Sequence, residues 1–135
     1  MKLSSYKDLI VWQKSMNLVE EIYKLTGEFP KSETYGLASQ MQRCAVSIPS
    51  NIAEGYKRNH SAEYIQFLSI ANGSGAEIET QIEICKRIPD LKNHDYKKAE
   101  ELLEEVMKML NVIIYKLSTK RHAKNSIPYT LNPIP

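Results

Sequence analysis

Four segments of the sequence place apolar residues three or four positions apart, which is the spacing of one face of an α-helix. Glycine and proline separate these segments, and the sequence contains neither alternating strand patterns nor an Asn-Gly or Asp-Gly hairpin signal. We therefore expect an all-α fold, in which four amphipathic helices with short connections form an antiparallel up-and-down four-helix bundle.

The first helix is expected to begin near Tyr6, because Ser5 is a favourable N-cap and Asp8 follows three residues later, as in a capping box. Gly27 and Pro30 should end it, since glycine favours the position after a helix and proline disfavours helix just before itself. Two adjoining rows of apolar residues give this helix an apolar face that is wide enough to contact two neighbouring helices.

The other three helices follow from the same spacing. The second is expected over residues 32–56 with a kink near Pro49, because proline removes a backbone donor and crowds the carbonyl of Ala45. The third is expected over residues 61–88, and Asn93 is a suitable cap for the fourth.

The predicted bundle ends at Ser118. Residues 119–135 contain three prolines and three formal positive charges, and they lack an apolar helical repeat. We expect residues 1–118 to form one four-helix domain and residues 119–135 to form a mobile, proline-rich basic tail.

Composition excludes several classes of protein. The chain has 135 residues, of which 42% are hydrophobic and 25% charged, as in ordinary globular domains. No apolar run reaches the roughly 18 residues of a membrane span, and the N-terminal segment has no apolar signal region, so we expect a cytoplasmic protein without membrane contact. The net charge of +2 is too small to imply a polyanionic partner by itself.

One face of the predicted second helix is polar. It carries Gln40, Arg43, Ser47, Asn51, Glu54 and Arg58. This face is either solvated, with helical support from Glu54 to Arg58, or it meets polar residues of a neighbouring helix or subunit. We select Arg43, Ser47, Asn51, Glu54 and Glu77 as structural polar anchors. Arg43 is expected to bind the Glu77 carboxylate, so Glu77→Ala should weaken assembly or stability.

A second stripe on the predicted third helix lies away from its core face. It consists of Ile70, Gly73, Ser74, Glu77, Gln81, Ile84 and Ile88. Close packing inside one bundle would explain it, and so would a subunit interface. We favour the interface, because a four-helix bundle needs only one core-facing stripe per helix.

Catalytic chemistry has no support in the sequence. The three histidines share no helical face at metal-ligand spacing, and Cys44 and Cys85 lack the close spacing of a metal or redox pair. Nucleophile motifs, phosphate-binding glycine loops and dinucleotide fingerprints are missing. We therefore expect a non-enzymatic protein with no metal and no cofactor.

Nucleic-acid binding has weak support from two small basic clusters. Lys57 and Arg58 lie near the end of the predicted second helix, and Lys120, Arg121 and Lys124 lie in the predicted tail. A homo-oligomer would multiply these charges into a ring that neutralises many phosphates.

Four motifs carry a family resemblance. LIVWQKS, FPKSETYGLASQM, RCAVSIPSNIAEG and FLSIANGSGAEIETQI resemble the bacterial four-helix-bundle family encoded in large-subunit rRNA intervening sequences, over about residues 6–118. The family is often labelled ribosomal protein, and it is related to the accessory variability determinant of diversity-generating retroelements. The resemblance implies ring-shaped homopentamers, and the related branch binds its reverse transcriptase and nucleic acid. Cys44 and Gly75 depart from the family pattern.

The expected function is a non-enzymatic, homo-oligomeric binding module, by the resemblance a pentamer, that associates with RNA, single-stranded nucleic acid or ribonucleoprotein. The alternative is an adaptor that binds another protein, such as one encoded nearby, without direct nucleic-acid contact. The small net charge and the absence of base-stacking aromatic clusters favour this alternative.

Overall fold

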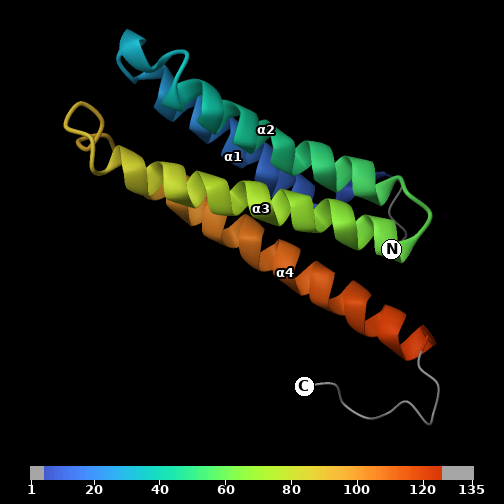
Figure 1. The fold of residues 1–135 in the computed structure, drawn as a ribbon. Coiled ribbons are helices and arrows are strands. Elements are labelled where there is room, and N and C mark those ends of the chain that lie inside the picture. Colours follow the sequence, from blue (N-terminus) through green and yellow to red (C-terminus); the bar gives the residue numbers. More distant parts are fainter. Residues whose placement is uncertain (1–4, 126–135) are drawn as a thin grey trace.

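Four long helices make up the chain in the computed structural model, which describes residues 5–125 and their side chains up to residue 122 (Figure 1). They are α1 (Ile10–Gly27), α2 (Leu37–Tyr56), α3 (Ser61–Cys85) and α4 (Lys97–Asn125), and two short 3-10 turns, η1 (Tyr6–Asp8) and η2 (Lys31–Glu33), precede α1 and α2. The described residues include no strand, which confirms the predicted all-α class.

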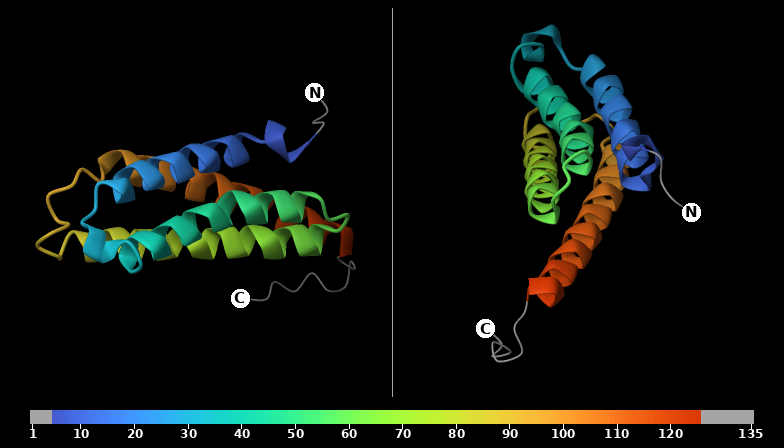
Figure 2. Two further views of the ribbon diagram at one scale, coloured as in Figure 1. Left: turned by 90° about the horizontal axis from the view of Figure 1, so that it is seen from above. Right: turned by 90° about the vertical axis from the view of Figure 1, so that its right-hand side faces the viewer.

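The helices pack as an up-and-down bundle (Figures 1 and 2). Each contacts its two neighbours in the order α1, α2, α3, α4 and back to α1, and α2 packs most extensively on α3. Burial of apolar side chains in the centre drives this packing. The largest fully buried side chains include Leu18, Ile22, Met41, Ile48, Ile52, Leu68, Ile78, Ile82, Val106 and Leu110.

The predicted capping box is present, but it caps η1 instead of α1. The Ser5 hydroxyl accepts from the Lys7 amide at 3.0 Å, and the Ser5 amide donates to Asp8 Oδ2 at 3.2 Å. The α-helix proper then begins at Ile10 and ends at Gly27, where the sequence predicted its end.

Helix α2 begins later than predicted and passes through Pro49 without interruption. Residues 31–36 form η2 and a turn, and the Glu33 carboxylate accepts from the Leu37 amide at 3.4 Å where α2 starts. Pro49 thus lies within one helix, as expected, and the bend near it stays a prediction.

The connection between α3 and α4 is longer than predicted. Helix α3 ends at Cys85, and a compact loop leads to α4 at Lys97. Asp95 Oδ1 accepts from the Lys97 amide at 3.0 Å, so Asp95 and not Asn93 provides the side-chain acceptor there. The Tyr96 hydroxyl donates to the Leu91 carbonyl at 2.7 Å, which fixes the loop against the core.

Helix α4 extends to Asn125, so the expectation of a non-helical tail from residue 119 is corrected for residues 119–125. These seven residues contain no glycine or proline. The side chains of Lys120 and Arg121 also complement the negative end of the helix dipole, which favours the extension. Residues 126–135, the rest of the predicted mobile tail, lie outside the described residues.

Candidate nucleic-acid and subunit interface

A row of polar side chains runs between α2 and α3. We call it the polar seam, and it consists of Cys44, Ser47, Asn51, Ser74, Glu77 and Gln81. Ser47 and Ser74 are joined through their hydroxyl oxygens at 2.9 Å. The Asn51 amide nitrogen donates to the Ser47 carbonyl at 2.8 Å and to its hydroxyl at 3.0 Å. Two predicted anchors on α2 thus connect to the predicted α3 stripe.

Cys44 occupies the next part of the seam. Its thiol donates to Glu77 Oε2 at 3.2 Å, and the Gln81 amide nitrogen donates to the Cys44 sulfur at 3.4 Å. Burial, followed by the hydrogen bond to Glu77, raises the pKa of the Cys44 thiol. The thiol therefore stays protonated at neutral pH and serves as a hydrogen-bond donor.

Glu77 does not bind Arg43 within the chain, contrary to the expected pairing. Arg43 is exposed and donates to the Ser39 hydroxyl at 3.4 Å, and the described residues include no ion pair between Arg43 and Glu77. One helical position turns a side chain by about 100°, so Cys44 faces α3 and Arg43 faces solvent beside it. The sequence reading missed Cys44, although Cys44, Ser47 and Asn51 share the spacing of one helix face.

Glu54, the remaining predicted anchor, lies outside the seam. Its carboxylate accepts from Arg58 at 2.9 Å, which is the helical support expected for a solvated face. The side chain is exposed, so this ion pair adds little to stability.

Gly55 permits close packing at the end of α2. A Cβ atom at this position would lie 2.8 Å from Phe67 Cβ and 3.0 Å from Tyr64 Cδ1. No larger residue fits unless α3 moves. The glycine of the SIPSNIAEG motif therefore sets how closely α3 approaches α2, in addition to its predicted place before the connection.

The predicted interface stripe of α3 divides into two sets. Ser74 and Gln81 are buried in the polar seam, and Ile88 is half-buried against the core. The other members form an exposed set that we call the α3 outer face, namely Ile70, Gly73, Glu77 and Ile84. Ile70 is 47% exposed and Ile84 is 43% exposed, and a Cβ atom at Gly73 would meet nothing within 4 Å.

Both basic clusters lie at one end of the bundle, which we call the basic end. The end of α2, the start of α3 and the end of α4 meet there (Figures 1 and 2). A cavity of about 350 Å³ lined by Ile65, Ser118, Arg121 and His122 joins α3 to the last turns of α4. The fold thus gathers charges that are more than sixty residues apart in the sequence.

The cations of the basic end differ in their partners. Arg58 lies 2.9 Å from Glu54, 3.8 Å from Glu63 and over the Phe67 ring, so its charge is largely compensated. Lys57 lies over the Tyr6 ring at 5.6 Å. Lys120 and Arg121 are exposed and form no ion pair with any described residue. The backbone of Lys124 belongs to the last turn of α4, and its side chain lies outside the described set.

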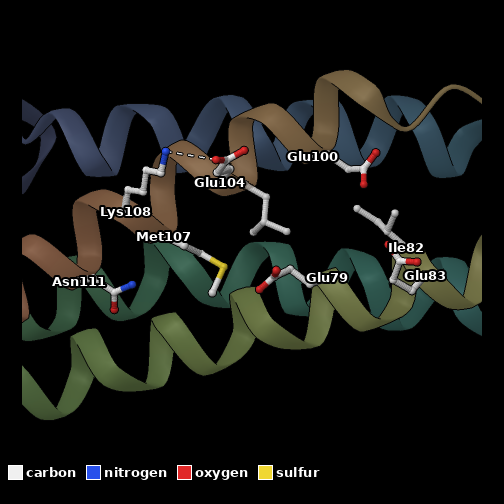
Figure 3. Close-up of a pocket in the computed structure, with 9 residues that line it drawn as sticks. Glu79, Ile82, Glu83, Glu100, Glu104, Met107, Lys108 and Asn111 are labelled. Carbon is white, nitrogen blue, oxygen red and sulfur yellow. Dashed lines mark ion pairs between the residues drawn. The ribbon is translucent and has the colours of Figure 1, made fainter.

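An acidic pocket lies between the last turns of α3 and the first half of α4. Its volume is about 490 Å³, and Figure 3 shows four carboxylates around it, from Glu79, Glu83, Glu100 and Glu104. Lys108 binds Glu104 at 3.1 Å. No group of histidine, cysteine or carboxylate side chains among the described residues could hold a metal ion. Lys86 lies 2.7 Å from Glu100 and 3.6 Å from Glu83, so lysines compensate three of these four carboxylates.

None of the helices in the part of the chain that the structure describes is both long and apolar enough to cross a membrane. The family model described as 23S rRNA-intervening sequence protein matches residues 7–112, which include the polar seam and the α3 outer face. The comparison with curated proteins gave no match.

Proposed function

We propose a function on one premise: the chain belongs to the 23S rRNA-intervening sequence protein family, whose model covers most of its length. The proposed function is a non-enzymatic binding module that forms a homo-oligomer in the cytoplasm and associates with RNA or with a ribonucleoprotein such as the ribosome. It needs no cofactor, and it uses its side chains for binding alone.

The observation that carries this proposal is the basic end. Lys120 and Arg121 are exposed and form no ion pair with the residues that the structure describes, and Lys57 lies at the same end of the bundle. Phosphate contacts need such uncompensated cations, because binding releases the counterions of the nucleic acid.

Assembly of several copies supplies the charge that one copy lacks. The α3 outer face leaves Ile70 and Ile84 exposed, and exposed apolar groups on one helix face favour contact with another subunit. The family resemblance implies a pentamer, in which Lys120 and Arg121 alone would provide about ten cations. In such an assembly Arg43 is free to bind a carboxylate of a neighbouring copy.

The direct test measures binding of labelled structured RNA and labelled single-stranded DNA by fluorescence anisotropy at about 50 mM and about 200 mM salt. The Lys120→Ala, Arg121→Ala double variant should bind more weakly, and its affinity should depend less on salt. Arg87→Ala, Lys92→Ala is the matched control, because it removes one lysine and one exposed arginine from the opposite end. Equal loss in both variants, or no binding at low salt, would contradict the proposal.

The second candidate function is a protein-binding adaptor that makes no direct contact with nucleic acid. The net charge of +2 favours it, because the chain as a whole attracts polyanions weakly. Absence of RNA binding at 50 mM salt, together with an intact oligomer, would select this candidate.

A further inference from the structure

An apolar groove lies between the start of α1 and the middle of α4. It has a volume of about 490 Å³, and its apolar lining consists of Leu9, Ile10, Val11, Met109, Val112 and Ile113. Ile10 is 61% exposed and Val112 is 51% exposed, so solvent reaches the groove in a single chain. We call this feature the α1–α4 groove. Exposed apolar surface of this kind favours a bound partner.

The α1–α4 groove and the α3 outer face lie on opposite sides of the bundle. The helices contact one another in the order α1, α2, α3, α4 and back to α1, so the side formed by α1 and α4 lies across the core from the side formed by α2 and α3 (Figure 2). The α3 outer face belongs to the second side, because its Glu77 bonds to Cys44 of α2. Each chain therefore presents a different exposed apolar surface on each of two opposite sides.

Two different surfaces on opposite sides fit one kind of contact between identical chains. A two-fold contact joins a surface to the same surface of its partner, so it would cover the α3 outer face and leave the groove open, or the reverse. A heterologous contact joins one surface to the other, and its repetition in a closed assembly covers both surfaces of every copy. The occupant that leaves neither apolar surface exposed is therefore a second copy of the chain.

The apolar centres of the two surfaces lie at the same height along the bundle. The side chain of Asn72 on α3 donates to that of Asn111 on α4 at 3.2 Å, which sets these two residues level. Ile70 lies two residues before Asn72, about 3 Å nearer the basic end, and Val112 lies one residue after Asn111, about 1.5 Å nearer the same end. Two copies in the same orientation, side by side, therefore bring Ile70 of one level with the groove of the next.

Charged groups beside the two apolar centres have opposite signs at similar heights. Lys108 lines the groove and lies three residues before Asn111, about 4.5 Å away from the basic end. Glu77 lies five residues after Asn72, about 7.5 Å in the same direction, and both side chains are exposed. The ion pair of Lys108 with Glu104 is exposed and therefore weak, so it leaves Lys108 able to approach Glu77 of a neighbouring copy. Such a pair would fix the register of the two copies.

We propose that the α3 outer face of one copy packs into the α1–α4 groove of the next copy. Ile70 enters the groove beside Ile10 and Val112. Gly73, one turn further along α3, has no side chain that would hold the copies apart. Because the two surfaces are level, the repeated contact stays in one plane instead of rising as a helical filament does. The inference rests on the proposed homo-oligomer, and it adds the surface that receives the α3 outer face.

The test measures the mass of the assemblies by sedimentation equilibrium at high protein concentration. Ile70→Asp puts a charge on the α3 outer face and Val112→Asp puts one into the groove, so each variant alone should sediment as single chains. An equimolar mixture of the two variants should contain dimers, because the intact groove of the Ile70→Asp chain receives the intact outer face of the Val112→Asp chain. Each dimer must contain both variants, and its two remaining surfaces are charged, so it should not grow further.

A control variant makes the test specific for these two surfaces. Tyr23→Asp changes a similarly exposed residue of α1 outside both surfaces, and it should keep the mass of the wild type. Helical circular dichroism should be the same in all variants, because each replaced side chain is exposed.

The outcomes separate this inference from the proposed homo-oligomer. An assembled wild type together with full mass in Val112→Asp or in Ile70→Asp would overturn the inference alone, since one of the two surfaces would then be unused. A mixture that contains only single chains would exclude the contact between the outer face and the groove. A wild type that itself sediments as single chains would contradict the homo-oligomer, and the inference with it.

Discussion

Cys44 and Glu77 form a hydrogen bond across the α2–α3 interface, in which the thiol donates to the carboxylate over 3.2 Å. Glu77 is exposed and Cys44 is half-buried, so the bond lies where the polar seam meets solvent. This hydrogen bond connects α2 to α3 at the position where the sequence analysis predicted an ion pair between Arg43 and Glu77. The chemistry of this pair can be tested through both the carboxylate and the thiol.

Removal of the carboxylate should change both stability and thiol reactivity. Glu77→Ala should lower the free energy of unfolding by about 0.5–1.5 kcal/mol, the usual contribution of one hydrogen bond. It should also lower the pKa of the Cys44 thiol, so that alkylation by iodoacetamide at pH 8 becomes faster. Glu79→Ala is the matched control, because Glu79 is exposed on the same helix and is not part of the seam. Identical alkylation rates in wild type and Glu77→Ala would exclude an effect of the carboxylate on the thiol.

Stability should decrease at alkaline pH. Burial raises the pKa of the Cys44 thiol, of the Cys85 thiol and of the Tyr96 phenol. A group with a raised pKa in the folded state stabilises the fold fully below its unfolded pKa and loses that contribution as the pH rises toward the folded value. Urea unfolding should therefore show a constant midpoint up to about pH 8 and a falling one above it, since free thiols titrate near 8.5. The Cys44→Ala, Cys85→Ala variant should show a smaller decline between pH 8 and pH 10, and a decline as steep as in wild type would argue against the thiols.

Gly55 and Gly73 should respond to alanine in opposite ways. Gly55→Ala should destabilise the fold by about 1–3 kcal/mol, because its Cβ would overlap Phe67. A Cβ atom at position 73 would have no neighbour within 4 Å in its own chain. Gly73→Ala should therefore raise the free energy of unfolding of the single chain by up to about 1 kcal/mol through helix propensity. Urea unfolding midpoints measure both, and a destabilised Gly73→Ala chain in dilute solution would be the contrary result.

The serine pair in the seam should show energetic coupling. Ser47→Ala, Ser74→Ala and the double variant form a double-mutant cycle, and the coupling should be about 0.5–1.5 kcal/mol. Ser50 and Thr80 lie on exposed positions of the same helices, and each bonds to a carbonyl of its own helix. A cycle between Ser50→Ala and Thr80→Ala should give no coupling, and additivity in the Ser47 and Ser74 cycle would mean that their contact adds nothing to stability.

The α3 outer face should control assembly. Ile84→Asp should reduce the mass measured by light scattering after size-exclusion chromatography, because a charge would replace an apolar contact between subunits. Tyr23→Asp changes a similarly exposed aromatic residue on α1 and should leave the mass unchanged. Helical circular dichroism should be equal in both variants. An unaltered oligomer in Ile84→Asp would remove this face from the proposed interface.

The number and order of the helices could be predicted because apolar spacing is a property of each segment alone. The helix ends were harder to place. Residues 32–36 have no strong breaker before Gly36, yet a 3-10 turn and the Glu33 carboxylate shift the start of α2 to Leu37. Residues 119–125 have no apolar repeat, but they are compatible with helix and continue α4.

The polar contacts could be predicted only in part. Projection of single helices grouped Ser47 with Asn51 on one helix and Ser74 with Glu77 and Gln81 on the next. Within the chain these side chains and Cys44 form the polar seam. Such a projection could not select Cys44 over Arg43 as the partner of Glu77, because the choice of partner depends on how α2 and α3 are rotated against each other. The meeting of the two basic clusters depends likewise on the order and direction of the helices in the bundle.

The even number of helices has a practical consequence. Helix α1 starts and α4 finishes at the same end of the bundle, and Lys120 and Arg121 belong to the last turns of α4 there (Figure 1). A fluorescent label or a surface linker attached at the start of α1 or at the end of α4 therefore lies at the same end of the bundle as these cations. The loop over residues 86–96 lies at the far end, and a label introduced there leaves the approach of a large polyanion unobstructed.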